Sequence, residues 1–303
     1  MSAPAQRFGL SCALTTPFGV DGRCDVARLA THARSRLAAG CSSVTVFGTT
    51  GEGPSLSTAA RAGVLDGLAR AGLDVAGTVV AGVMASAAGD AIEQVRAARQ
   101  RGVRRFLLAP PFYFKNVPAD GLGRWFNETL GAFRGENVEF LLYHIPSVTS
   151  VPLPIELIAT LKATHGTLVR GVKDSSGDWA YSSKLLDLAS QLTILIGDER
   201  HLAQAVRQGG EGAISGCANF MPEVLLPLAR DGRDDARVAD IVDLLLRYPV
   251  TPAVKAAQAW RDADPSWLRV APPLVAIGER EAESIGRTCA TILERERLAV
   301  SGD

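Results

Sequence analysis

The sequence has no run of lysine and arginine long enough to follow a nucleic-acid backbone, and no excess of charge of either sign. Among its 303 residues, 32 are Lys or Arg and 32 are Asp or Glu, so the net charge is zero. No overall field therefore attracts nucleic acid or an anionic membrane surface. The chain also lacks the roughly 18 apolar residues of a membrane-spanning helix, and its first residues lack the basic start and apolar core of a signal peptide. We expect a cytoplasmic protein that binds neither nucleic acid nor a membrane.

Cysteine and histidine are sparse, and neither occurs at a spacing typical of a metal site. The five cysteines are odd in number and widely spaced, with none in a Cys-x-x-Cys pattern. Neither a disulfide framework nor a zinc site is therefore indicated. Ligands of zinc sites usually occur in pairs separated by a few residues, and the four histidines show no such spacing. We expect no metal ion and no cofactor.

Short apolar segments alternate with amphipathic helical segments through most of the chain. Eight segments have the length and composition of buried strands, namely residues 11–14, 43–47, 78–83, 106–109, 139–143, 168–173, 193–196 and 212–215. A helical pattern follows each of them. Buried strands that alternate with helices indicate a parallel sheet covered on its outer face. Eight such units predict a closed (β/α)8 TIM barrel, and a doubly wound open sheet is the structural alternative.

The last part of the chain reads as helical throughout. Helical patterns cover residues 237–247, 253–259 and 279–298, and no polar linker separates them from the preceding units. We therefore expect two parts: a barrel with the active site over residues 1–230, and a C-terminal helical appendage over residues 231–303.

Lys173 lies at a position where a barrel enzyme would have its active site. Lys173 ends an apolar strand and precedes the turn Asp-Ser-Ser-Gly, and barrel enzymes place their sites at the carboxyl ends of the strands. Partial burial of an amine disfavours its ammonium form. A neutral amine is a nucleophile that forms a Schiff base with a ketone or aldehyde. A solvated lysine that merely ends a strand is the alternative interpretation.

A glycine-rich loop follows the second predicted strand. Residues 47–53 read Phe-Gly-Thr-Thr-Gly-Glu-Gly, and glycines allow several backbone N–H groups to converge on one anion. Thr49 and Thr50 add two hydroxyl donors, which suits a small carboxylate. The loop matches neither the dinucleotide-binding G-x-G-x-x-G pattern nor the lysine-containing P-loop. A glycine-rich turn without a ligand is the alternative.

Tyr143 ends the strand that precedes the strand of Lys173. Neighbouring strands lie about 4.8 Å apart, so the phenol is expected close to the amine. A group that donates and accepts protons beside a nucleophile is what Schiff-base chemistry needs. A half-buried structural tyrosine is the alternative.

These motifs together resemble the dihydrodipicolinate synthase/N-acetylneuraminate lyase family of class I Schiff-base lyases. The matching pieces fall in the family's order over nearly the whole chain and are residues 14–18 (LTTPF), 48–52 (GTTGE), 111–113 (PFY), 143–146 (YHIP), 171–174 (GVKD) and 212–215 (GAIS).

The resemblance implies a role for each matched residue. Lys173 would form an imine with the keto carbon of a 2-oxo acid, and Tyr143 would be the general acid and base. Gly48, Thr49 and Thr50 would bind the substrate carboxylate, and the backbone carbonyl of Ile214 would face the keto acid. Tyr113 would reach across a dimer interface into the neighbouring site, and Thr16 would link the tyrosines. The resemblance also implies a homo-oligomer, a dimer or a tetramer.

The chain departs from the synthase branch of the family near Pro146. An arginine usually stands two residues after this proline, where it would pair with the carboxylate of the incoming aldehyde, but here Val148 occupies that position. Asp198 and Glu199 resemble the acidic pair that binds sugar hydroxyls in the sialic acid lyase branch, although both also suit a helix start. Ser175 follows the lysine and either meets hydroxyls or closes the turn.

We therefore expect an aldolase or dehydratase acting on a 2-keto-3-deoxy sugar acid or a pyruvate-derived aldol. Condensation of pyruvate with aspartate semialdehyde, the reaction of 4-hydroxy-tetrahydrodipicolinate synthase, is the alternative. A barrel that binds a keto acid without catalysis is a further alternative, which the joint presence of Lys173 and Tyr143 disfavours. His144 stands where the family commonly has asparagine, and packing is favoured over a role in the site.

Overall fold

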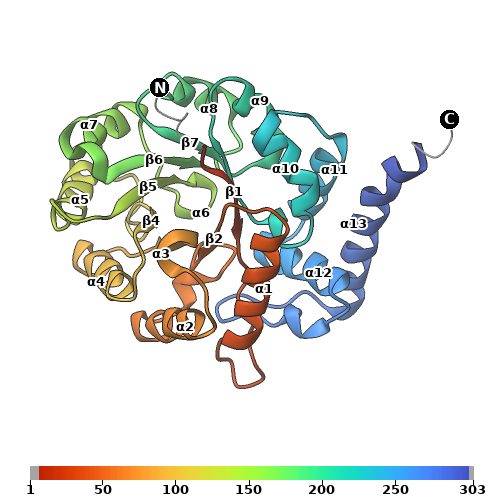
Figure 1. Ribbon diagram of the computed structural model, residues 1–303. Coiled ribbons are helices and arrows are strands. Elements are labelled where there is room, and N and C mark those ends of the chain that lie inside the picture. Colours follow the sequence, from red (N-terminus) through yellow and green to blue (C-terminus); the bar gives the residue numbers. More distant parts are fainter. Residues whose placement is uncertain (1–6, 300–303) are drawn as a thin grey trace.

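The chain folds into a closed barrel of eight parallel strands surrounded by helices (Figure 1). The computed structural model describes residues 7–299, with side chains described to residue 295. The strands are β1 (Gly9–Ala13), β2 (Ser43–Val46), β3 (Val79–Val83), β4 (Arg105–Leu108), β5 (Glu139–His144), β6 (Val169–Asp174), β7 (Thr193–Ile196) and β8 (Gly212–Ser215). They follow one another around the barrel in chain order, and β8 pairs with β1. The predicted (β/α)8 barrel is confirmed, and the open sheet is excluded by this closure.

Helices connect the strands along the outside of the barrel. Those of the barrel itself are α1 (Val26–Ala38), α2 (Thr58–Arg70), α3 (Val75–Thr78), α4 (Ala88–Arg99), α5 (Ala119–Gly131), α6 (Pro146–Thr149), α7 (Ile155–His165), α8 (Trp179–Leu186), α9 (Leu202–Arg207) and α10 (Pro222–Asp231). Several begin at an acidic or hydroxyl side chain that accepts a backbone N–H bond; Asp25, for example, accepts from the N–H of Arg28. Such caps satisfy donors that the first helical turn leaves open.

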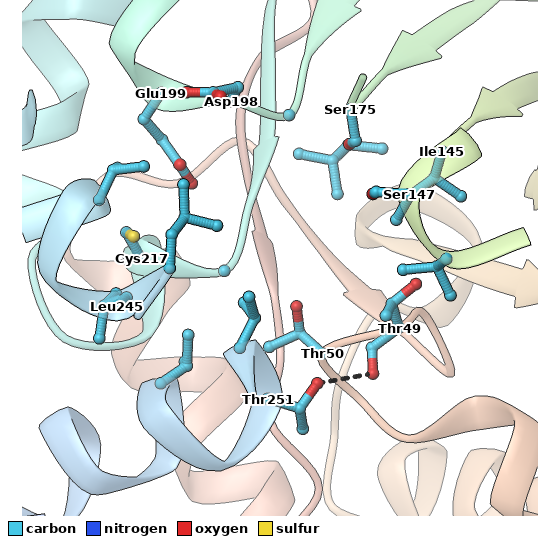
Figure 2. A pocket seen from close by; sticks show the side chains of 18 of the residues that line it. Thr49, Thr50, Ile145, Ser147, Ser175, Asp198, Glu199, Cys217, Leu245 and Thr251 are labelled. Atoms are coloured by element: carbon cyan, nitrogen blue, oxygen red, sulfur yellow. Dashed lines mark hydrogen bonds between the residues drawn. The ribbon is translucent and has the colours of Figure 1, made fainter. Parts of the chain in front are cut away.

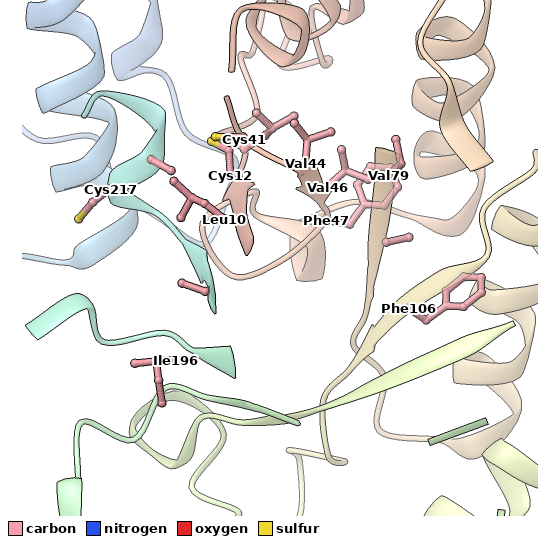
Figure 3. Close-up of a cluster of buried hydrophobic side chains, with 14 of the residues drawn as sticks. Leu10, Cys12, Cys41, Val44, Val46, Phe47, Val79, Phe106, Ile196 and Cys217 are labelled. Atoms are coloured by element: carbon pink, nitrogen blue, oxygen red, sulfur yellow. The ribbon is translucent and has the colours of Figure 1, made fainter. Parts of the chain in front are cut away.

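The alternation of side chains along each strand separates two cores. On β5, Phe140 and Leu142 lie in the larger core between strands and helices, whereas Leu141 and Tyr143 lie inside the barrel. This follows from the period of two in an extended chain. Figure 3 shows part of the larger core, where Val44, Phe106 and other apolar side chains pack outside the strands. Fully burying such a side chain stabilises the fold by about 1.5–3 kcal/mol.

Three further helices follow the barrel, α11 (Ala236–Leu245), α12 (Val250–Arg261) and α13 (Glu279–Ala299). In Figure 1 they lie together at one side of the barrel, with α13 outermost. Residues 251–259 of α12 are all buried, because α12 packs between α13 and the end of the barrel. None of the helices in residues 7–299 combines the length and apolarity needed to cross a membrane.

The structure moves some of the expected element ends. The strand expected from residue 78 begins at Val79, because Asp74 caps the short helix α3 immediately before it. The helical segment that follows the seventh predicted strand begins as a 3-10 turn (Glu199–His201) and continues as α9. The helix expected over residues 253–259 extends to both sides as α12.

Candidate active site

Lys173 and Tyr143 lie side by side at the carboxyl ends of adjacent strands. The register of β5 and β6 places them directly opposite each other, and both side chains extend into the barrel. Nζ of Lys173 donates to Oη of Tyr143 at 3.2 Å and lies 4.4 Å from the centre of its ring. Both residues are buried, with 6% and 2% of their surface exposed. The amine and the phenol are therefore within reach of one bound carbonyl carbon.

The Gly-Thr-Thr-Gly loop (residues 47–53) turns sharply after β2 beside this pair. Two backbone bonds close it, from the N–H of Glu52 to the carbonyl of Thr49 and from Gly53 to Gly48, both at 3.0 Å. A methyl group on Gly53 would lie 1.8 Å from the carbonyl oxygen of Phe47, so glycine is required there. Oγ1 of Thr49 lies 3.4 Å from Oη of Tyr143.

Two carbonyl groups of this loop accept hydrogen bonds from side chains outside it, and three of its backbone N–H groups are left for a ligand. Thr16 Oγ1 donates to the carbonyl of Gly51 at 2.6 Å, and Thr251 Oγ1 donates to that of Thr49 at 3.2 Å. Within residues 7–299, the backbone N–H groups of Thr49, Thr50 and Gly51 donate to no protein acceptor. Free N–H groups and hydroxyls in one small loop form a site for an anion.

A cavity of about 180 Å³ connects the loop to the lysine. Figure 2 shows other side chains that line it, with Thr49 and Thr50 of the loop among them. On the barrel side most of its lining residues are polar or small, namely Thr49, Thr50, Tyr143, Ser147, Lys173, Ser175, Gly197, Asp198, Glu199 and Gly216, and the apolar Ile145, Val148 and Ile214 join them. Apolar side chains of α11 and α12, such as Leu245 and Val254, line the opposite side. A second, largely apolar chamber of about 260 Å³ adjoins it across Tyr143 and Ile145 and reaches Met84 and Phe112.

Asp198 and Glu199 line the cavity, but both side chains already have partners. Asp198 forms an ion pair with Arg200 at 2.6 Å, and Arg200 also pairs with Asp243 of α11 at 2.7 Å. Glu199 is buried and accepts a 2.5 Å hydrogen bond from Oγ of Ser215. Burial raises the pKa of Glu199 above its ordinary value, against the effect of that hydrogen bond.

Tyr113 does not meet the other expected site residues within this chain. It lies in the loop after β4 with 73% of its surface exposed, and its ring packs edge-on against Phe114. The other expected site residues gather at one end of the barrel, namely Gly48, Thr49, Thr50, Tyr143, Lys173, Ser175, Asp198, Glu199 and Ile214. Thr16 contacts this group through Gly51.

His144 faces the helix layer and not the cavity. Its register partner is Asp174, and Nδ1 lies 3.4 Å from Oδ1 of that residue, while its ring packs on Tyr181 at 4.0 Å. Asp174 accepts a 2.5 Å bond from Ser182. Although burial acts to raise it, hydrogen bonds from these neighbours hold the pKa of Asp174 below its ordinary value.

Sequence reasoning missed several residues that complete the site. Thr251 and the apolar wall come from α11 and α12, far away in the chain, and carry no local motif. Gly197 was missed as well, although a methyl group there would lie 2.9 Å from Cε of Lys173. Its place directly after β7, beside the strand of the lysine, was the available signal. Among the described residues, no three His, Cys, Asp or Glu side chains gather to hold a metal ion.

Comparison with known proteins identifies the family. The model of the dihydrodipicolinate synthetase family matches residues 6–290. The chain belongs to this family. It is therefore an enzyme of the class I type, which forms a Schiff base through a lysine, as the sequence predicted.

Three similar members of the family illustrate how far the likeness extends. An uncharacterized DapA-like lyase of Chloroflexus aurantiacus is 35% identical over 93% of this chain and 95% of its own. A 4-hydroxy-tetrahydrodipicolinate synthase of Sorangium cellulosum is 31% identical over 96% and 98% of the two chains. The crystal structure of dihydrodipicolinate synthase from Agrobacterium tumefaciens is 46% identical, with a TM-score of 0.91 over 94% of this chain and 99% of that one.

Proposed function

We propose that Lys173 is the lysine that forms the imine, with the keto carbon of a 2-oxo acid. The observation that supports this most directly is the 3.2 Å contact between its amine and Oη of Tyr143 inside a cavity bordered by the Gly-Thr-Thr-Gly loop. A nucleophile, a proton donor and an anion site stand together there, as such a reaction requires.

The geometry suggests how the reaction proceeds. The amine of Lys173 adds to the keto carbon, and Tyr143 passes the proton that the amine loses to the oxygen, which becomes a hydroxyl group. A second proton from solvent, delivered through Tyr143, lets this hydroxyl leave as water. The resulting protonated imine draws electrons from the neighbouring carbon. Breaking a C–C bond at that carbon, or loss of its proton to Tyr143, gives an enamine. The enamine then takes up a proton, adds to an aldehyde carbon, or expels a hydroxyl group from the next carbon, which leaves as water with a proton from Tyr143. Tyr143 is placed to accept and return the proton in either direction.

The substrate carboxylate would bind at the Gly-Thr-Thr-Gly loop. The hydroxyls of Thr49 and Thr50 and the unused N–H groups of the loop supply directed donors without a full countercharge. Binding the carboxylate there fixes the keto carbon next to Lys173 and turns the addition into a reaction between held groups.

Borohydride trapping tests this assignment. Folded protein is incubated with pyruvate and borohydride, and its intact mass is measured. A single stable adduct on the wild type, absent from Lys173→Ala, is the expected result. The absence of any adduct on the folded wild type would refute the assignment, and so would an adduct of equal yield on Lys173→Ala.

We infer that the substrate is a 2-keto-3-deoxy sugar acid or a related pyruvate-derived aldol. Ser147 and Ser175 line the cavity and are able to meet hydroxyl groups. Lys173 is the one basic side chain among the described residues that line it. The mouth carries Val148, 59% exposed, and so offers no charge to a second substrate carboxylate.

The alternative substrate pair is pyruvate with aspartate semialdehyde. It is favoured by the similarity to proteins named 4-hydroxy-tetrahydrodipicolinate synthase. A panel of 2-keto-3-deoxy sugar acids, with pyruvate plus aspartate semialdehyde as a comparison, separates the two candidates. Pyruvate release and water loss are measured independently, so that aldolase and dehydratase activity are also distinguished. Turnover of the semialdehyde alone would overturn the sugar-acid proposal.

We also propose a homo-oligomer in which Tyr113 reaches a neighbouring copy. Tyr113 and Phe114 are 73% and 74% exposed, next to Phe112 at the apolar chamber, and adjacent exposed aromatic rings are typical of contact surfaces. Mixing Tyr113→Phe with Lys173→Ala, after dissociation and reassembly, should restore part of the activity that each variant has lost. No recovery in mixed oligomers would place Tyr113 outside the partner's site.

A further inference from the structure

A buried ion pair joins the Gly-Thr-Thr-Gly loop to the C-terminal helices. Glu52 of the loop and Lys255 of α12 are in direct contact, and both side chains are fully buried. Lys255 also donates to the carbonyl of Arg269 at 2.5 Å, and its amine lies 4.7 Å from the centre of the Phe18 ring. The second oxygen of Glu52 accepts from the N–H of Ala271 at 2.7 Å. Both oxygens of this carboxylate are therefore bound by the C-terminal part of the chain.

Glu52 controls the shape of the loop through its backbone. Its φ angle is +54°, a left-handed conformation that residues with a side chain seldom adopt. Its N–H donates to the carbonyl of Thr49, which also accepts from Thr251 of α12. The side chain and main chain of Glu52 are thus fixed together, and the fixed loop keeps the donors of Thr49 and Thr50 at the cavity.

Stability alone does not account for this pair. Removing two charges from water is costly, and apolar residues of similar size often replace such pairs without loss of stability. Burial acts to raise the pKa of Glu52 and to lower that of Lys255, while the contact between them opposes both shifts. Lys255 lines neither chamber of the site, so it does not act on a substrate directly.

We propose that Glu52 and Lys255 are positioning residues that hold the Gly-Thr-Thr-Gly loop in the shape that binds the substrate carboxylate. This inference rests on the proposed function of that loop. Tyr143 lies on β5 and Lys173 on β6, and within the described part of the chain no hydrogen bond or ion pair joins either of them to Glu52 or Lys255. Loss of the pair therefore weakens recognition of the carboxylate and leaves the nucleophile in place.

The test compares two carbonyl compounds of nearly equal size, pyruvate and its uncharged amide, pyruvamide. Borohydride trapping gives the concentration of each that produces half-maximal adduct, and the ratio of the two measures carboxylate recognition. We expect the preference of the wild type for pyruvate to fall about tenfold or more in Lys255→Met and in Glu52→Gln, because small displacements of a binding group have large effects. Trapping of pyruvamide should change little.

A double variant and a matched control make the result specific. Glu52→Gln/Lys255→Met leaves no unpaired buried charge, so it should fold even if a single variant does not, and its preference should still be low. Ile285→Ala removes a side chain, 1% exposed, from α13 in the same C-terminal part. It should lower the melting temperature and leave the preference unchanged.

The outcomes distinguish failure of the proposed role of Lys173 from failure of the proposed positioning role of Glu52 and Lys255. A wild type that forms no adduct refutes the role of Lys173. A wild type that forms an adduct, with a double variant that keeps the full preference for pyruvate, refutes the positioning role alone. An equal loss of preference in Ile285→Ala would also refute it, since a general loosening of the C-terminal helices would then explain the effect.

Discussion

Replacing Gly197 with alanine tests whether Lys173 needs the space that this glycine leaves. The added methyl group would lie 1.9 Å from Oγ of Ser175 and 2.9 Å from Cε of Lys173. The φ angle of Gly197 lies outside the left-handed region, so alanine meets no backbone strain. The hydroxyl of Ser175 can rotate away at little cost. The side chain of Lys173 cannot move aside so easily, because its backbone is fixed in β6 and the side chain lies inside the barrel.

The expected loss follows from that distance. Carbon atoms normally approach to about 3.5 Å, so Cε must move by about 0.6 Å. Misplacing a reacting group by about 1 Å costs about 100-fold in rate. We therefore expect the rate of imine trapping at low pyruvate concentration to fall about 10- to 100-fold, or about 1.4–2.7 kcal/mol.

Two further variants complete the test of Gly197. Adding Ser175→Ala to Gly197→Ala removes the 1.9 Å contact and leaves those with Cε of Lys173 at 2.9 Å and with Cβ of residue 175 at 3.0 Å, so most of the loss should persist. Gly63→Ala in α2 is the matched control, because nothing lies within 4 Å of its added methyl group. Its trapping rate should equal that of the wild type. A Gly197→Ala protein that traps pyruvate at the wild-type rate would refute the reasoning.

Three other predictions concern single residues. Tyr143→Phe should lower kcat by about 10²- to 10⁴-fold in steady-state assays while pyruvate still protects the protein against thermal unfolding; unchanged turnover would remove its role as acid and base. Glu199→Gln should raise the melting temperature at pH 8, because the buried carboxyl has a raised pKa and its contribution to stability is lost as pH rises through that value. The gain should vanish near pH 4, with about 2–4 °C for each kcal/mol gained, and a gain independent of pH would contradict it. Phe106→Ala, in the fully buried core, should lower the free energy of unfolding by about 3–5 kcal/mol in urea titrations; a loss below 1 kcal/mol would contradict this.

The barrel was predictable because each unit carries its own signals. Buried strands such as β3 are continuous apolar runs, and helices such as α1 begin at a capping side chain and bury one face. Those signals are local, and eight repeats of them leave few topologies. The adjacency of Tyr143 and Lys173 was predictable for the same reason, since consecutive parallel strands are neighbours in a barrel.

What could not be predicted depends on contacts between distant parts of the chain. Nothing near Thr251 or Lys255 in the sequence indicates that both reach the loop after β2. Nothing near Asp198 indicates that Arg200 would also bind Asp243 of α11. These contacts are set by how α11 and α12 pack over the barrel end, and helix packing angles are not encoded in a short motif.

The contacts that Asp198 and Glu199 already make reduce how readily each can bind a hydroxyl group of a substrate. A sugar hydroxyl that approaches Asp198 must share its carboxylate with Arg200, and one that approaches Glu199 meets a side chain already bonded to Ser215. By contrast, the hydroxyls of Ser147 and Ser175 line the same cavity and have no hydrogen-bond partner within the part of the chain that the structure describes. A serine hydroxyl both donates and accepts, so it can bind a substrate hydroxyl without breaking an existing ion pair. We therefore expect the two serines, more than the two carboxylates, to distinguish a hydroxylated 2-oxo acid from an unsubstituted one.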